Sequence, residues 1–215
     1  SRNDYYDIGL EMIDSGFDYF AGGALLQPTG KEEDQTDLYT LAAEAGYTVV
    51  KTQAEAETVT ADTGKAILID EHLADGDSMP YELDRTDDMW SLADYVEKGI
   101  ECLDNDTGFF MMVEGGKIDW ACHANDAGST LHDTQALSDA VQKAIDFYNE
   151  HPDETLILVT GDHETGGLTI GYAGTDYDTF LTNLSNQKIS YAKYDSNYVA
   201  GYKENNTSFE DVMKD

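Results

Sequence analysis

The sequence is poor in basic residues and contains no long apolar segment. Only 12 of its 215 residues are lysine or arginine, against 44 aspartates and glutamates, so the formal net charge is −32. A surface with this charge repels nucleic acid and anionic membranes, and neither is expected as a partner. No run of 18 apolar residues occurs, which excludes a membrane-spanning helix among these residues.

Cysteine is also scarce. Cys102 and Cys122 are the only two, which excludes a disulfide scaffold, and we expect two free thiols. The chain starts at Ser1 without the charged and then apolar layout of a signal peptide. A signal peptide that has been removed would leave no trace, so this start does not indicate the cytosol.

Apolar residues make up 40% of the chain and aromatic residues 11%, enough for a hydrophobic core. Helical periodicity predicts helices over residues 4–15, 36–45, 90–103 and 130–149. Short apolar runs predict strands over residues 17–20, 47–51, 66–69, 109–113 and 156–160. The last two runs are continuous, as is typical of strands covered on both faces. Helices alternating with such strands predict an α/β fold with a mainly parallel sheet.

The character of the chain changes after Gly171. Residues 172–215 are rich in Tyr, Asn, Asp, Ser and Thr and show little periodicity. We therefore predict an α/β core over residues 1–171, followed by an irregular, insertion-like segment of the same domain over residues 172–215.

Carboxylate and imidazole groups directly follow the two continuous apolar runs. Glu114, Asp119 and His123 come after the first run, and Asp162 and His163 come after the second. Ligands of open parallel sheets bind at the carboxyl ends of the strands. We therefore predict that these five side chains meet at one edge of the sheet.

The spacing of these residues suits divalent metals. Asp119 and His123 share a helix face if the chain is helical from Lys117, and zinc accepts such an oxygen and nitrogen pair. Asp162 and His163 are adjacent, so both can reach one ion from a tight loop. Two metals about 4 Å apart form the clamp that phosphoryl transfer uses.

Each motif has an ordinary alternative interpretation. An Asp-x-x-x-His pair on a helix is usually a solvated face, and Asp-His dipeptides are common. His132 on the predicted long helix is interpreted as a surface histidine. The combination of five such groups after two buried strands favours the metal site over chance.

The strings FFMMVEGGKIDWACHAND and LILVTGDHETGG, joined by a long predicted helix, resemble the metal-binding half of alkaline phosphatases. The resemblance is strong from residue 109 to residue 167 and looser over residues 1–103. It implies an alkaline-phosphatase-like α/β sandwich and a hydrolase of phosphate monoesters that acts through a phosphoserine. It also implies a secreted or periplasmic location, a homodimer, and two zinc ions with one magnesium ion as cofactors.

Carried over by position, the resemblance assigns Asp119 and His123 to the first zinc ion. It assigns Asp162 and His163 to the second zinc ion and Glu114 to the magnesium ion. It places Arg2 where the family grips the substrate phosphate, a task that suits the planar guanidinium.

The chain also departs from the family pattern. The nucleophilic serine lies in an Asp-Ser-Ala-type motif, which is absent here, and no histidine follows His163 to complete the ligand set. We therefore expect an incomplete portion of a longer enzyme that binds metal weakly and is inactive alone. The alternatives are a phosphodiesterase, sulfatase or phosphomutase of the same superfamily, or a non-catalytic acidic cation-binding module.

Overall fold

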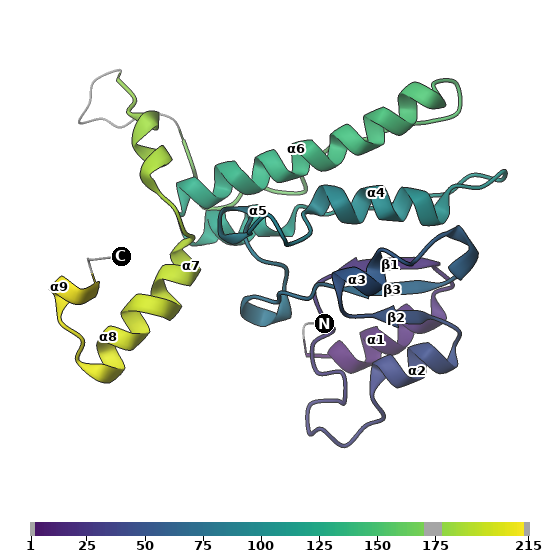
Figure 1. Cartoon of the computed structure of the whole chain (residues 1–215), viewed down its shortest axis with the longest axis horizontal. Helices are drawn as coiled ribbons and strands as arrows, with labels where there is room; N and C mark the ends of the chain where they lie inside the picture. Colours follow the sequence, from purple (N-terminus) through teal and green to yellow (C-terminus); the bar gives the residue numbers. More distant parts are fainter. Residues whose placement is uncertain (1–2, 170–177, 213–215) are drawn as a thin grey trace. The chain divides into compact units, whose positions relative to one another are not determined.

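The structure is a computed structural model, and it describes residues 3–169 and 178–212 (Figure 1). The chain forms two compact units. The first comprises Ser1–Pro80, Thr86–Val113 and Asp139–Glu154, and the second comprises Tyr81–Arg85, Glu114–Ser138 and Thr155–Asp215. Helix α6 (Ala127–Glu150) contributes residues 127–138 to the second unit and the remainder to the first.

A three-stranded parallel sheet organises the first unit. Its strands are β1 (Tyr19–Gly22), β2 (Thr48–Val50) and β3 (Ala66–Ile69), in the order β1-β3-β2. All four residues of β3 are buried, because this strand is paired on both sides. The parallel sheet predicted from sequence is confirmed, although β1 starts two residues later than expected, because its pairing with β3 begins at Tyr19 and Ala66.

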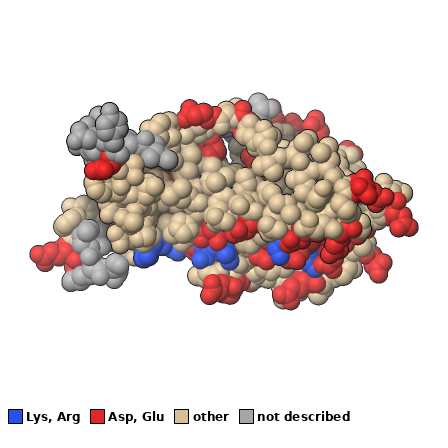
Figure 2. Space-filling view, turned by 90° about the horizontal axis from the view of Figure 1, so that it is seen from above, with Lys and Arg blue, Asp and Glu red and all other residues tan. Residues whose placement is uncertain are grey.

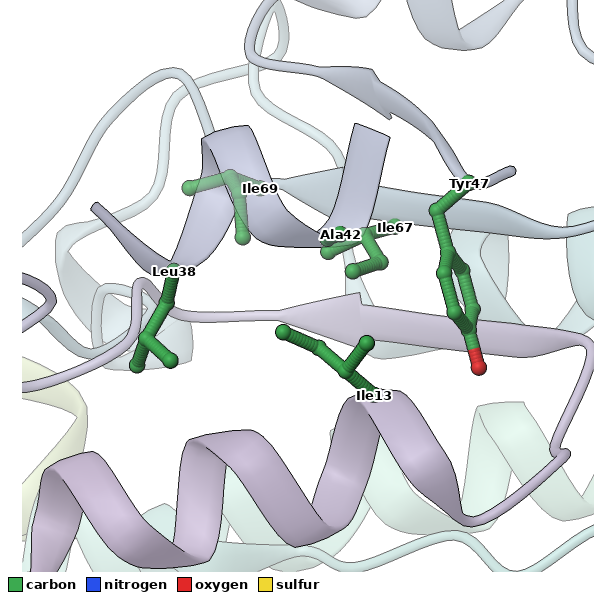
Figure 3. Packing of buried hydrophobic residues seen from close by; sticks show 6 residues of the cluster. All are labelled: Ile13, Leu38, Ala42, Tyr47, Ile67 and Ile69. Carbon is green, nitrogen blue, oxygen red and sulfur yellow. The ribbon is translucent and has the colours of Figure 1, made fainter. Parts of the chain in front are cut away.

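Two helices cover one face of this sheet. Helices α1 (Tyr5–Asp14) and α2 (Leu38–Glu44) match the amphipathic stretches expected near them. Leu38 is fully buried and lies in a cluster with Ile13 of α1 and with Ile67 and Ile69 of β3 (Figure 3). A Cβ at Gly9 would overlap the Leu38 side chain, so glycine permits this close helix packing.

Helix α4 (Leu92–Leu103) packs on a second cluster of sheet residues. Ser91 starts this helix with a capping box, in which its hydroxyl accepts from the Asp94 amide and the Asp94 carboxylate accepts from the Ser91 amide. Tyr95 lies in the cluster with Ala66 and Leu68. The sheet is therefore covered by helices on both faces, as an α/β sandwich requires.

Short elements complete the first unit. Those of the first unit are α3 (Gln53–Ala56), η1 (Ala61–Thr63) and η2 (Asp75–Asp77). The short helix η3 (Glu82–Asp84) belongs to the second unit. No helix among the described residues is long and apolar enough to cross a membrane.

The two continuous apolar runs are not strands, and this prediction was wrong. Residues 109–113 and 156–160 have no strand assignment. The side chains of Phe110 and Met112 are each 79% exposed, and those of Leu156 and Leu158 are 81% and 80% exposed. A strand needs hydrogen-bonded neighbours, and within the described ranges neither segment belongs to the sheet. An apolar run predicts a tendency to be buried but does not supply its partner.

The second unit is largely helical. It contains α5 (Gly116–His123), the first half of α6, and a series of short helices near the end of the chain. That series comprises η5 (Leu181–Asn186), α7 (Tyr191–Tyr194), the π-helical η6 (Asp195–Val199), α8 (Ala200–Asn205) and α9 (Phe209–Val212).

Much of the segment expected to be irregular is therefore helical where it is described. Ser190 caps this helical stretch by accepting from the Lys193 amide, and Asn206 ends it with φ 51°. Serine and asparagine at these ends were the available sequence signals. The predicted boundary at residue 171 falls outside the described residues and stays a prediction.

Candidate metal centre

Helix α5 places the first pair of candidate ligands. The helix extends from Gly116 to His123, so Asp119 and His123 lie four residues apart on one helix, as predicted. The Asp119 Oδ1 atom lies 3.5 Å from His123 Nε2. Their side chains are 37% and 71% exposed, which leaves both open to an ion from solvent. This pair follows from the i, i+4 geometry of one short helix.

The second pair lies in the loop after residue 160. Asp162 Oδ2 is 3.4 Å from His163 Nε2, and both side chains are mostly exposed. The other ring nitrogen, His163 Nδ1, lies 3.1 Å from the backbone carbonyl oxygen of Glu164. This carbonyl, and then the Asp162 carboxylate, raise the pKa of His163.

A threonine hydroxyl connects the two pairs. Thr165 Oγ1 donates to Asp119 Oδ1 at 2.6 Å and lies 3.0 Å from His163 Nδ1. The next residue, Gly166, has φ 76°, and a Cβ there would overlap the Cys122 carbonyl oxygen of α5. The loop therefore approaches the helix at a position where only glycine fits.

The fifth candidate ligand is not linked to these four by a described contact. Glu114 is exposed, and no hydrogen bond or ion pair between described residues joins it to the two pairs. Arg2 lies outside the described residues. Among the side chains that the structure describes, no group of three or more His, Cys, Asp or Glu is arranged to hold a metal. The candidate centre is two linked pairs.

The spacing within each pair suits a tetrahedral zinc ion. Four ligands at about 2.0–2.1 Å from a tetrahedral zinc lie roughly 3.3–3.4 Å from one another. The observed separations of 3.5 Å for Asp119 with His123 and 3.4 Å for Asp162 with His163 are close to this value. Each pair therefore fits two positions of one tetrahedral ion, with oxygen and nitrogen donors that zinc accepts.

The charge of the surface favours the binding of cations. On the face shown in Figure 2, Asp and Glu side chains are more widespread than Lys and Arg side chains. This distribution attracts cations in general, so it supports but does not locate a metal site. Both cysteines are free thiols, as predicted from the sequence.

Sequence analysis missed a buried carboxylate in the second unit. Asp133 of α6 is 7% exposed; its Oδ1 accepts from the Glu82 amide, and its Oδ2 has no partner among the described residues. Burial raises the pKa of Asp133 to about 7. A sequence signal was present, because Ala136, Leu137 and Ala140 follow Asp133 at helical spacing and place it on the apolar face.

The pKa of Asp126 is shifted in the opposite direction from that of Asp133. Burial opposes its ionisation, but hydrogen bonds from Gln187, Tyr191 and Ser129 outweigh burial and lower its pKa. Its carboxylate joins the start of α6 to the chain near Ser190. It is therefore a structural anion, already saturated with donors.

Known proteins match this chain. The family model described as "Alkaline phosphatase" matches residues 16–215. The chain is 36% identical over 142 residues to alkaline phosphatase 3 of Bacillus subtilis, covering 66% of this chain and 29% of that protein. It is 32% identical over 149 residues to the repressible alkaline phosphatase of Saccharomyces cerevisiae, covering 65% and 26%. The chain thus spans less than a third of these two relatives.

Solved structures are similar over most of the chain. A cold-active alkaline phosphatase from Shewanella sp. superposes with a TM-score of 0.78 at 29% identity, covering 93% of this chain and 47% of that one. The Thermus thermophilus alkaline phosphatase gives 0.73 at 29% identity, covering 90% and 41%. A mutant of the TAB5 alkaline phosphatase, described as having magnesium bound, gives 0.56 at 27% identity, covering 67% and 40%.

Proposed function

The chain belongs to the alkaline phosphatase family, and we propose that it supplies the metal-binding portion of an enzyme that hydrolyses phosphate monoesters through a phosphoserine. The similar solved structures confirm the predicted alkaline-phosphatase-like α/β fold. The observation that supports the proposed activity is the pair of Asp–His contacts linked by Thr165. We prefer this function to a phosphodiesterase, sulfatase or phosphomutase because the matched family is the phosphatase.

Each candidate residue has a proposed task. Asp119 and His123 would hold one zinc ion, Asp162 and His163 a second, and Glu114 a magnesium ion. Bound divalent ions supply positive charge beside the attacking and leaving oxygens of phosphoryl transfer. The carboxylates contribute negative charge that retains the ions, and the imidazoles contribute neutral nitrogen donors. Arg2 would bind the phosphate oxygens of the substrate.

The chain alone is proposed to be inactive. It contains no Asp-Ser-Ala-type nucleophile, and each Asp–His pair supplies only two ligands. Loss of a nucleophile that acts as part of a unit removes nearly all of the chemical rate enhancement. A secreted or periplasmic location and a homodimer stay predictions from the family.

Metal binding should depend on the named carboxylates and not on the net charge. We expect Asp119→Asn, and separately Asp162→Asn, to lower the Zn²⁺ affinity of the chain at least tenfold, because each removes an anionic oxygen donor. Competition with a chromophoric chelator at about 0.15 M ionic strength, where long-range attraction is screened, measures this affinity.

Asp153→Asn is the matched control, because Asp153 is an exposed aspartate outside the candidate centre. It should leave the affinity unchanged. An equal loss in all three variants would instead indicate diffuse binding over the acidic surface, and it would favour the cation-binding module over the enzyme-derived site.

The close approach of the loop to α5 provides a second test. We expect Gly166→Ala to lower the Zn²⁺ affinity about tenfold, because the added methyl overlaps the Cys122 carbonyl and separates Thr165 from Asp119. Gly167→Ala is the control, since Gly167 also has positive φ (67°) but nothing lies near its added Cβ. Similar losses in both variants would assign the effect to backbone strain and contradict the role of the close approach.

A further inference from the structure

The Thr165 side chain lies between the two halves of the candidate centre. Its hydroxyl is 2.6 Å from Asp119 Oδ1 on helix α5 and 3.0 Å from His163 Nδ1 in the loop. Among the described residues, this hydroxyl connects the Asp119–His123 pair with the Asp162–His163 pair. The residue is half-buried, whereas Asp162, His163 and Glu164 around it are exposed.

The contacts of His163 favour one tautomer of its ring. The Glu164 carbonyl can only accept, so the 3.1 Å contact requires a proton on His163 Nδ1. Thr165 Oγ1 lies 3.0 Å from the same nitrogen, so in this tautomer the hydroxyl oxygen accepts from the imidazole. The hydroxyl has one proton, and this proton is donated to the Asp119 carboxylate.

This arrangement selects the ligating atoms. With the proton on Nδ1, the neutral His163 ring presents its lone pair at Nε2, the atom that lies 3.4 Å from Asp162 Oδ2. On Asp119, the Thr165 hydroxyl restrains the carboxylate by its hydrogen bond to Oδ1. Both ligands are therefore oriented before any ion arrives, which reduces the ordering that binding requires.

We propose that Thr165 is a positioning residue, which orients Asp119 and His163 as metal ligands and couples the two sites through its hydroxyl. This inference rests on the proposed function. It assigns a role to a side chain that is not itself expected to touch the metal or the substrate. Outer hydrogen bonds to metal ligands are typically worth 10- to 100-fold in metal affinity.

The test compares variants that keep or remove the hydroxyl. Thr165→Val keeps the shape of the side chain and removes the hydroxyl, and Thr165→Ser keeps the hydroxyl. We expect Thr165→Val to weaken Zn²⁺ binding about 10- to 100-fold in chelator competition. Thr165→Ser should stay within about threefold of the unsubstituted chain, on the same reasoning that the donor remains. Thr165→Ala replaces the valine variant if that variant fails to fold.

A second readout separates positioning from folding. The thermal unfolding midpoint in chelator, without metal, should be similar for Thr165→Val and Thr165→Ser, because Thr165 lies in a short, mainly exposed loop. A zinc affinity that is unchanged in Thr165→Val while Asp119→Asn loses binding would overturn the Thr165 proposal alone. If Asp119→Asn also leaves binding unchanged, the proposed metal site is wrong and this inference falls with it.

Discussion

Replacing Leu38 with alanine is expected to lower the free energy of unfolding of the sheet-containing unit by about 3 kcal/mol, within the range of buried Leu→Ala changes. Leu38 is 0% exposed and lies in the cluster formed by α1, α2 and β3. Gly9 brings the α1 backbone against this side chain. The other members of the cluster remain packed around this position, so we expect the space left by the missing atoms not to close fully.

Urea denaturation followed by far-ultraviolet circular dichroism measures the loss. Leu73→Ala is the matched control, because it deletes the same atoms from a side chain that is 41% exposed in the same unit. We expect the control to cost less than about 1 kcal/mol, as is usual for surface positions. Equal costs in the two variants would mean that Leu38 does not anchor α2 on the sheet.

The second large effect concerns pH and the buried carboxylate of Asp133. Burial raises the pKa of Asp133 from 3.8 to about 7, and the nearby Glu82 and Asp84 carboxylates add to the shift, whereas the Glu82 amide and Lys117 oppose it. Between these two pKa values the folded chain holds a proton that the unfolded chain has released. Stability from this group is therefore present at low pH and is lost as pH rises to about 7.

The expected loss between pH 5 and pH 8 is on the order of 3 kcal/mol, at 1.36 kcal/mol for each pKa unit. Asp133→Asn keeps an oxygen that accepts from the Glu82 amide and removes the titration. Its free energy of unfolding, relative to that of the unsubstituted chain, should rise by this amount over the same interval.

Asp195→Asn, at an exposed position of the same unit, should show no such change. A constant difference between Asp133→Asn and the unsubstituted chain at all pH values would show that Asp133 is ionised when folded. Urea titrations at several pH values supply these numbers.

Local patterns predicted the fold where the chain also supplied the neighbours. The run at residues 66–69 was predicted as a strand and is one, because β1 and β2 pair with it on both sides. The run at residues 109–113 has the same apolar character but no pairing strand among the described residues, and Phe110 is exposed. Composition reports what a segment tends to bury, whereas strand pairing depends on distant parts of a chain.

The candidate site was likewise predicted from the sequence only in part. Asp119 with His123 follows from helical spacing, and Asp162 with His163 follows from adjacency, so both pairs were predicted from sequence. Thr165 was not predicted, because its contact with Asp119 spans 46 positions and depends on the loop reaching α5. Asp133 was not predicted, because an aspartate on a helix is usually solvated and its burial depends on packing that a local pattern does not show.

The uncovered apolar side chains have a consequence for how the chain behaves in solution. Phe110, Met112, Leu156 and Leu158 are almost fully accessible to water on a chain of net charge −32. At low ionic strength, mutual repulsion keeps two copies from bringing such groups together. Added electrolyte shortens the range of that repulsion while the apolar attraction persists, so colloidal stability depends on salt. Repulsion between the many carboxylates thus opposes the association of copies through these exposed apolar segments.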